Sequence, residues 1–283
     1  MPTTSSEGST GKYPSGAEPH KARETAEGFG ANAARYDRTR PGYPQRLIAR
    51  ITAAADTSAD GGRPTVLDVG CGTGIASRLL QSAGCRVLGV EPDARMAEFA
   101  RARGTEVEVS TIEEWDPAGR RFDAVVAGQA WHWVDPVAGA ARAAEALRRP
   151  AGRLVVFWNV FRASEEVQQA FTAAYRRTLT GLPEGFQALP GADVYQRMVD
   201  IAANGIRESG AFEEPQEWRH DWEREYTRDE WLDQVPTFGG FNRFPPEQLD
   251  ALLAAVGEAV DAMGGSFTLG YTAAAVAARV AGD

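Results

Sequence analysis

A glycine-rich segment directly follows a short apolar run in the first third of the chain. The run at 65–69 leads into Gly70-Cys71-Gly72-Thr73-Gly74, and an amphipathic pattern begins at Ile75. Glycine adopts backbone dihedrals that other residues resist, so such a loop turns a strand sharply into a helix and lets a ligand approach the backbone. The segment therefore predicts a strand–loop–helix unit with a ligand site at the loop.

The same alternation of strand and helix patterns continues on the C-terminal side of this loop. Short apolar runs predict further strands at 86–90, 107–110, 122–127 and 152–158. Helical patterns between such runs are typical of a parallel sheet with both faces covered, and right-handed crossovers make that sheet doubly wound. We expect a Rossmann-like, doubly wound, mostly parallel seven-stranded α/β sheet with a helical lid. Its last strand, at 266–280, should be antiparallel, although its alanines favour a helix locally.

Composition and pattern divide the chain into segments of different character. Residues 1–22 contain almost no large apolar side chain, so they are expected to be a disordered tail. The other expected segments are an N-terminal helical arm (23–58), the ligand-binding core (64–160), a helical lid (163–212) and a C-terminal part that completes the sheet (217–283).

Charge and composition exclude several classes of partner. A net charge of −9 over 283 residues argues against nucleic acid or an anionic membrane, because binding to phosphates requires a basic face. The sequence has neither a membrane-spanning apolar run nor a secretory leader at its start, so we expect a cytoplasmic monomer or homodimer. Cys71 and Cys85 have no metal-binding spacing, and we expect reduced thiols and no metal site.

The spacing of the glycines distinguishes between ligands. The dinucleotide fingerprint is Gly-x-Gly-x-x-Gly, but here Ile75 occupies the place of the last glycine. This disfavours a pyrophosphate, and hence a nicotinamide oxidoreductase, and suits a ligand with an amino-acid tail. Glu91 ends the next strand, where a carboxylate can accept hydrogen bonds from both hydroxyls of a ribose.

Three motifs together resemble the class I S-adenosylmethionine (SAM)-dependent methyltransferases. They are VLDVGCGTG at 66–74, VEPD at 90–93 and FDAVVAGQAWHW at 122–133. With RPGYP at 40–44 and FWN at 157–159, the chain is most similar to the trans-aconitate methyltransferase-like branch, which acts on small molecules. The resemblance covers residues 27–160 well and 217–280 loosely, and it implies SAM as the cofactor.

The resemblance also implies a role for individual residues. Gly70 and Gly72 would pack beneath the methionine part of SAM, and Asp68 would orient the loop and receive the amino group. Glu91 would bind the ribose, and the backbone of Ala130 would contact the amino group. The residues around the adenine would be Pro92, Met96, Ile112 and Glu113, with Ile112 replacing an alanine of the relatives. The arm residues that would close over the carboxylate are Tyr36 and Arg40.

The candidates for chemistry follow the predicted fourth strand, at the sheet edge where such folds bind ligands. His132 is the candidate for acid–base catalysis or for orienting the acceptor; alternatively it is a packing or capping histidine. A base is needed only if the acceptor carries a proton that must leave. Trp131 and Trp133 are candidates to wall the acceptor pocket, with the alternative that one of them, Trp133, belongs to the core. The other substrate-binding candidates are Trp158, Phe171, Tyr175 and Phe241.

Two functions fit these patterns. The first is methyl transfer from SAM to a small molecule, with a carboxylate or hydroxyl oxygen as the first expectation and carbon or nitrogen as further options. The second is SAM binding without transfer, in a cyclase or a regulatory module. Only the first predicts S-adenosylhomocysteine formation that depends on an acceptor.

Overall fold

The computed structural model describes residues 28–55, 62–239, 241 and 244–282. The expected tail, together with residues 23–27 and 56–58 of the expected arm, lies outside the described residues. No helix in the described ranges combines the length and the apolar character that crossing a membrane requires.

Seven strands form one sheet in the order β3-β2-β1-β4-β5-β7-β6. The strands are β1 (Thr65–Val69), β2 (Arg86–Val90), β3 (Glu106–Glu108), β4 (Ala124–Gly128), β5 (Arg153–Arg162), β6 (Gln216–Thr227) and β7 (Ser266–Arg279). Strands β1 to β5 pair in parallel, and β7 pairs antiparallel with both β5 and β6. The predicted fold class is confirmed, including the antiparallel C-terminal strand. The alanines of β7 form a strand because β7 is inserted between two partners that pair with its backbone on both sides.

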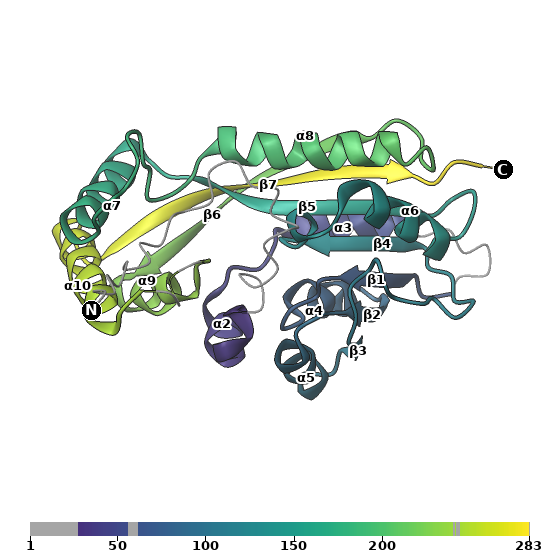
Figure 1. Ribbon diagram of the computed structural model, residues 1–283, viewed down its shortest axis with the longest axis horizontal. Helices are drawn as coiled ribbons and strands as arrows, with labels where there is room; N and C mark the ends of the chain where they lie inside the picture. Colours follow the sequence, from purple (N-terminus) through teal and green to yellow (C-terminus); the bar gives the residue numbers. More distant parts are fainter. Residues whose placement is uncertain (1–27, 56–61, 240, 242–243, 283) are drawn as a thin grey trace, which may run out of the picture.

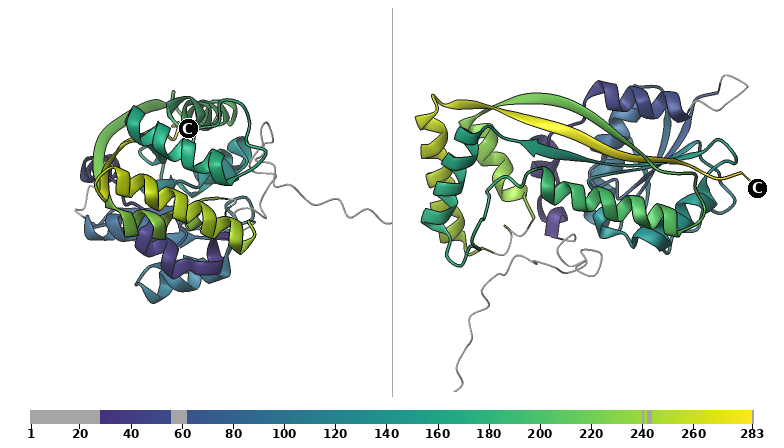
Figure 2. Two further views of the ribbon diagram at one scale, coloured as in Figure 1. Left: turned by 90° about the vertical axis from the view of Figure 1, so that its left-hand side faces the viewer. Right: turned by 90° about the horizontal axis from the view of Figure 1, so that it is seen from above.

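The helices are named with their bounds as follows: η2 (Gly28–Asn32), α2 (Ala33–Thr39), α3 (Gln45–Ala55), α4 (Ile75–Ser82), α5 (Ala94–Ala102), η3 (Trp131–Trp133), α6 (Pro136–Ala146), α7 (Glu165–Thr178), α8 (Ala192–Glu208), α9 (Arg228–Gln234), η4 (Val235–Thr237) and α10 (Pro246–Ala262). Successive strand residues face opposite sides of the sheet, so the two faces have separate cores. Helices α3 and α4 pack on one face together with Val155 and Phe157. Helices α6 and α8 pack on the other face with Leu154 and Val156, and Figure 2 shows α3 and α8 on opposite sides of the strands.

Strands β5, β6 and β7 run beyond the rest of the sheet. β5 was expected to end near residue 158, but its pairing with β7 continues to Arg162 opposite Gly270. The extended strands carry a second apolar cluster, formed with α7, α9 and α10 and containing Phe171, Trp231 and Leu252. Figure 1 shows α7, α9 and α10 at the end opposite to β1, β2 and β3.

The helices that were expected to form one lid pack in two different places. α7 lies against α10 in the second cluster. α8 lies along the sheet and against α6, where Gly205 is so close to Pro136 that a Cβ on it would stand 2.5 Å from the proline Cβ. The connection between the two helices contributes Pro183, Phe186 and Pro190 to the cavity described next.

Candidate functional site

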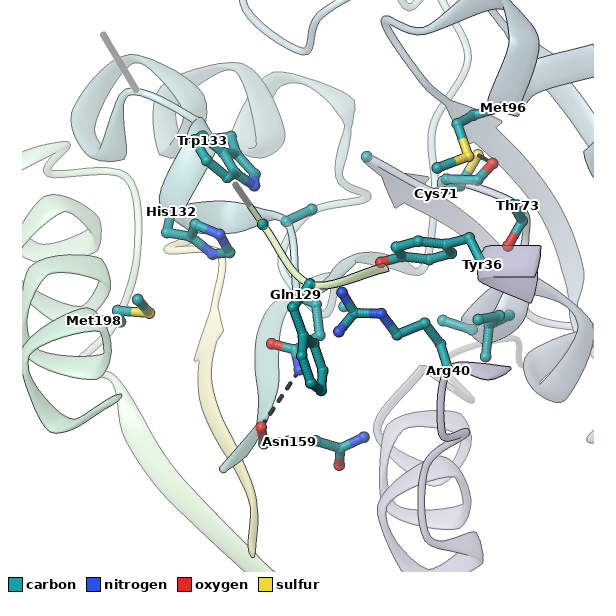
Figure 3. A pocket seen from close by; sticks show the side chains of 18 of the residues that line it. Tyr36, Arg40, Cys71, Thr73, Met96, Gln129, His132, Trp133, Asn159 and Met198 are labelled. Carbon is teal, nitrogen blue, oxygen red and sulfur yellow. Dashed lines mark hydrogen bonds between the residues drawn. The ribbon is translucent and has the colours of Figure 1, made fainter. Parts of the chain in front are cut away.

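A cavity of about 730 Å³ opens at the carboxyl ends of β1, β2, β4 and β5 and extends to the second apolar cluster. All eleven residues that the resemblance assigned to the cofactor line it: Tyr36, Arg40, Asp68, Gly70, Gly72, Glu91, Pro92, Met96, Ile112, Glu113 and Ala130. Figure 3 shows Tyr36 and Arg40 between Cys71, Thr73 and Met96 on one side and Gln129 and Asn159 on the other. The fold thus brings together segments that are far apart in the sequence.

The glycine loop is built around left-handed backbone conformations. Gly70, Gly72 and Gly74 have φ values of 63°, 57° and 86°. A Cβ on Gly70 would stand 2.5 Å from the Cβ of Ala130, which follows β4. Glycine is therefore required at position 70 for two reasons, the dihedral and the close approach of the neighbouring loop.

The carboxylate of Glu91 is held by two backbone N–H groups. Gly72 donates to Oε2 at 2.8 Å and Asp93 donates to Oε1 at 2.9 Å. Burial raises the pKa of Glu91 to about 7 against the opposing effect of these hydrogen bonds. Each oxygen keeps a further lone pair, so the carboxylate can still accept hydrogen bonds from a diol in the cavity.

Asp68 lies fully buried beneath the loop with one oxygen unpaired. Ser77 donates a hydrogen bond to Oδ2 at 2.6 Å, whereas Oδ1 has no partner. Burial raises the pKa of Asp68 to about 7, and the negative charge of Glu91 adds to this. A buried, unpaired carboxylate oxygen at the cavity fits a cationic donor such as an amino group.

Arg40, at the end of α2, is clamped between two aromatic rings. Its guanidinium carbon lies 4.9 Å from the ring centroids of both Tyr36 and Phe238. Its Nη2 donates to the carbonyl of Thr237, and its Nε is buried without a partner. Arg40 thus presents a cation with a free N–H group at the middle of the cavity.

Ion pairs fasten α2 to both ends of the molecule. On one side Asp37 pairs with Arg78 of α4 at 2.5 Å. On the other side Asp233 of α9 pairs with Arg35 at 2.8 Å and with Arg38 at 2.7 Å. The helix therefore connects the glycine-loop end of the cavity to the end formed by α9.

His132 lines the cavity with one of its nitrogens already engaged. The Nε1–H of Trp158 donates to Nδ1 of His132 at 3.2 Å. Burial lowers the pKa of His132 to about 4, so the ring is neutral near pH 7. In a neutral ring whose Nδ1 accepts a hydrogen bond, the proton resides on Nε2, which makes Nε2 a donor. A neutral ring with its proton on Nε2 suits hydrogen-bond donation into the cavity better than proton abstraction.

Of the two tryptophans of η3, both expected to wall the pocket, only Trp133 does so, and the core residue is Trp131 rather than Trp133. Trp133 is half-buried and lines the cavity, whereas Trp131 is 2% exposed and packs in the core beside Gly139. Trp158 also lies in the core, and it reaches the site only through His132. The single turn of η3 explains this, because it points its first residue into the sheet and its third into the cavity.

The aromatic candidates of the second cluster divide in the same way. Tyr175 and Phe241 line the cavity, but Phe171 stacks on Trp231 at 5.5 Å and does not. We call the far end of the cavity the acceptor lobe, defined by six rings: Phe161, Tyr175, Phe186, Phe238, Phe241 and Tyr271.

Some lining residues were not identified from the sequence: Tyr43, Gln129, Tyr195, Met198, Gln234 and Tyr271. Tyr43 and Gln129 lie inside the RPGYP and GQAWHW motifs, which could have indicated them. Gln129 also has a φ of 58°, a strained value for a residue with a side chain and one that occurs often at functional sites. Gln234 and Tyr271 come from segments without any motif.

The strand order and the glycine loop after β1 define the class of Rossmann-like methyltransferases. A solved structure of a candidate type II methyltransferase from Anaeromyxobacter dehalogenans has this fold; it is 24% identical, with a TM-score of 0.59, and the match covers 86% of this chain and 99% of that one. The family model described as a methyltransferase domain matches residues 36–262. The chain belongs to this methyltransferase family.

The matching relatives are similar over part of their length. An uncharacterised methyltransferase of Mycobacterium tuberculosis is 37% identical over 139 residues, which are 48% of this chain and 54% of the relative. A ubiquinone biosynthesis O-methyltransferase of a Methylobacterium species is 38% identical over 94 residues, 31% of this chain and 38% of the relative. The chain thus spans about half the length of the first of these relatives and less of the second.

The cofactor of this family and fold is SAM, and the residues of the cavity fit it. The unpaired oxygen of Asp68 suits its ammonium group, and the carboxylate of Glu91 suits its ribose. The close packing of Gly70 on Ala130 leaves backbone, rather than side chains, facing the ligand.

Proposed function

We propose that this chain transfers a methyl group from SAM to an oxygen of a small-molecule acceptor. The observation that carries the proposal is that one cavity joins the glycine loop, with the unpaired Oδ1 of Asp68 beneath it, to the acceptor lobe. The similarity to relatives named O-methyltransferases supports oxygen as the target atom. On the motif resemblance alone, we also propose that the chain belongs to the trans-aconitate methyltransferase-like branch.

When bound, SAM supplies a methyl group on a positively charged sulfur, which is already activated for displacement. The chain has to hold the acceptor in line and exclude water, and orientation alone contributes roughly 7–11 kcal/mol to such reactions. Glu91, Asp68 and the glycine loop hold the cofactor, while His132 and Trp133 flank the passage to the acceptor lobe. The neutral His132 donates from Nε2 to an acceptor oxygen and so orients its lone pair.

Glu91→Ala tests the cofactor site. Loss of hydrogen bonds to a charged acceptor is worth roughly 1.5–3 kcal/mol, so we expect SAM affinity to fall about ten- to a hundredfold. Calorimetry with the folded variant measures this, and Glu114→Ala, outside the cavity lining, serves as the control. Unchanged affinity in Glu91→Ala would remove this residue from the site.

SAM affinity should increase with pH through about 7. In the free protein burial raises the pKa of both Asp68 and Glu91 to about 7, and the bound cofactor needs their ionised forms. Each carboxylate that has to lose its proton makes binding about tenfold weaker at pH 6 than at pH 8, and affinity levels off above the pKa. Calorimetry at the two pH values tests this, and equal dissociation constants would contradict it.

His132→Gln should retain most of the turnover, because a glutamine N–H can replace the Nε2–H donor. His132→Ala should lose about three- to tenfold, the worth of one neutral hydrogen bond. The rate profile should show no step from His132 between pH 6 and 7, since burial lowers its pKa to about 4. A loss of a hundredfold or more in His132→Gln would identify the residue as a general base instead.

The alternative is SAM binding without transfer. A solved [4+2]-cyclase, SpnF, shares the fold at 16% identity and a TM-score of 0.51, with 94% of this chain and 98% of that chain covered. Incubation with candidate acceptors decides between the two: our proposal requires S-adenosylhomocysteine to accumulate only when an acceptor is present.

A further inference from the structure

The amide of Gln234 is buried in the acceptor lobe without a hydrogen-bond partner. The residue ends α9, has 0% of its surface exposed and lines the cavity. Neither its Nε2 nor its Oε1 makes a hydrogen bond. Burying an unpaired amide opposes folding, so such a group calls for a ligand that pairs with it.

Two tyrosine hydroxyls lie next to this amide. Tyr226 and Tyr271 share one hydrogen bond of 2.6 Å, and each phenol has a single proton to donate. One proton of the pair therefore remains available. Burial raises the pKa of both phenols, and weak side-chain hydrogen bonding to Gln234 lowers it in part. The amide is therefore near the two hydroxyls, but the contacts do not reach the geometry of a full hydrogen bond.

The walls of the lobe are flat aromatic rings in a continuous series of contacts. Tyr175 meets Phe241 edge-on at 6.1 Å, Phe241 meets Phe238 at 6.2 Å, and Phe238 meets Phe161 at 6.1 Å. Phe161 in turn lies 5.5 Å from Tyr271. Such walls favour a flat ring system, which can stack on them or meet their edges.

Within the described residues, the charged groups that line the cavity belong to its other parts. Asp68, Glu91, Asp93 and Glu113 lie at the cofactor end, and Arg40, the single cation among the described lining residues, stands where the lobe begins, against the ring of Phe238. A multiply charged acceptor in the lobe would leave its charges buried without partners, which is strongly unfavourable.

We infer that the acceptor lobe binds a flat aromatic molecule without multiple charges, whose hydroxyl or carbonyl edge pairs with the amide of Gln234. The inference rests on the proposed function, since it names the substrate class of that site. It separates this chain from enzymes that act on aliphatic polycarboxylates. Gln234 supplies both a donor and an acceptor, so it selects for a polar edge as well as for an aromatic ring.

Binding of three probes to the protein saturated with S-adenosylhomocysteine tests the inference. 2-Naphthol has a flat ring and a hydroxyl, naphthalene has the ring alone, and citrate is an aliphatic polycarboxylate. Equilibrium dialysis should show retention of 2-naphthol, with about tenfold weaker binding by Gln234→Leu, the worth of one neutral hydrogen bond. Naphthalene should bind both proteins alike, and citrate should neither bind nor compete.

The melting temperature of the ligand-free variant gives a second readout. Gln234→Leu removes an unpaired buried amide, so it should melt at the same temperature as the wild type or higher, whereas a purely structural glutamine would make it lower. Gln169→Leu, on the exposed surface of α7, controls for the substitution itself, and Gln234→Met replaces Gln234→Leu if that variant does not fold. Absence of S-adenosylhomocysteine binding would overturn the proposed function. Retention of citrate, failure to bind 2-naphthol, or equal 2-naphthol affinity in the variants, with S-adenosylhomocysteine bound, would overturn the inference alone.

Discussion

Gly70→Ala should weaken SAM binding about a hundredfold or more. The residue has a φ of 63°, and its new Cβ would stand 2.5 Å from the Cβ of Ala130. The left-handed conformation costs a residue with a side chain roughly 1–2 kcal/mol, and the clash with Ala130 adds to this cost. In the variant the loop relaxes to another conformation. SAM binding then has to return the loop to the strained conformation, and this cost lowers the affinity. The displaced loop also loses the hydrogen bond from the Gly72 N–H to the charged Glu91, which contributes roughly 1.5–3 kcal/mol. Together these costs raise the dissociation constant of SAM about a hundredfold or more.

Gly84→Ala is the matched control for this substitution. Gly84, after α4, has a φ of 96°, but a Cβ there would meet nothing within 4 Å. It therefore carries the dihedral strain alone and lies outside the cavity lining. We expect a loss of stability of about 1 kcal/mol with an unchanged dissociation constant for SAM. If both variants bind SAM like the wild type, close packing of the loop on Ala130 has no part in binding.

Trp231→Ala should lower the free energy of unfolding by about 3–5 kcal/mol, the usual range for removing a buried large aromatic side chain. Trp231 is 1% exposed and is at the centre of the second cluster. Its ring lies 5.1 Å from that of Tyr226, 5.2 Å from Phe267 and 5.5 Å from Phe171. The variant leaves a cavity that these rings cannot fill without moving. Urea denaturation followed by circular dichroism measures the change.

Ile201→Ala controls for the loss of an apolar side chain. Ile201 lies on α8 with 53% of its surface exposed, so the change should stay within about 0.5 kcal/mol. A small loss in Trp231→Ala would show that the second cluster is loosely packed. That result would also weaken the description of the acceptor lobe as a set of fixed walls.

The parts of the fold with short-range patterns could be predicted from the sequence. Strand and helix alternate within 65–158, and β1, β2, β4 and β5 are buried on both faces, which gives each of them a distinctive apolar run. β7 was harder, because the alanines at 273–275 carry no strand signal of their own. Its conformation follows from the pairing of Trp158 with Ala274 and of Trp218 with Ala275, contacts between residues far apart in sequence.

The same division holds for the site. Residues at the ends of β1, β2 and β4, such as Asp68 and Glu91, occupy positions fixed by the fold, so motif spacing located them. The rings of the acceptor lobe come from β5, α7, β7 and the connections that follow α7 and η4. No local pattern distinguishes Phe171, which faces the core, from Tyr175, which faces the cavity. The assignment depends on how α7 is rotated against α10, which is a tertiary property.

The position of α2 has a consequence for how the cofactor and the acceptor affect each other's affinity. Through Asp37 the helix is tied to the end that holds the cofactor, and through Asp233 it is tied to α9, which ends at Gln234. A ligand that orders α2 from one end already accounts for part of the loss in conformational entropy of the helix. The second ligand then binds with a smaller entropic cost. Thermodynamic reciprocity then requires that the factor by which the cofactor raises affinity for the acceptor equals the factor by which the acceptor raises affinity for the cofactor. Replacing Arg35 and Arg38 with alanine would remove the ion pairs between α2 and Asp233 of α9. Each ligand should then raise the affinity for the other by a factor closer to one.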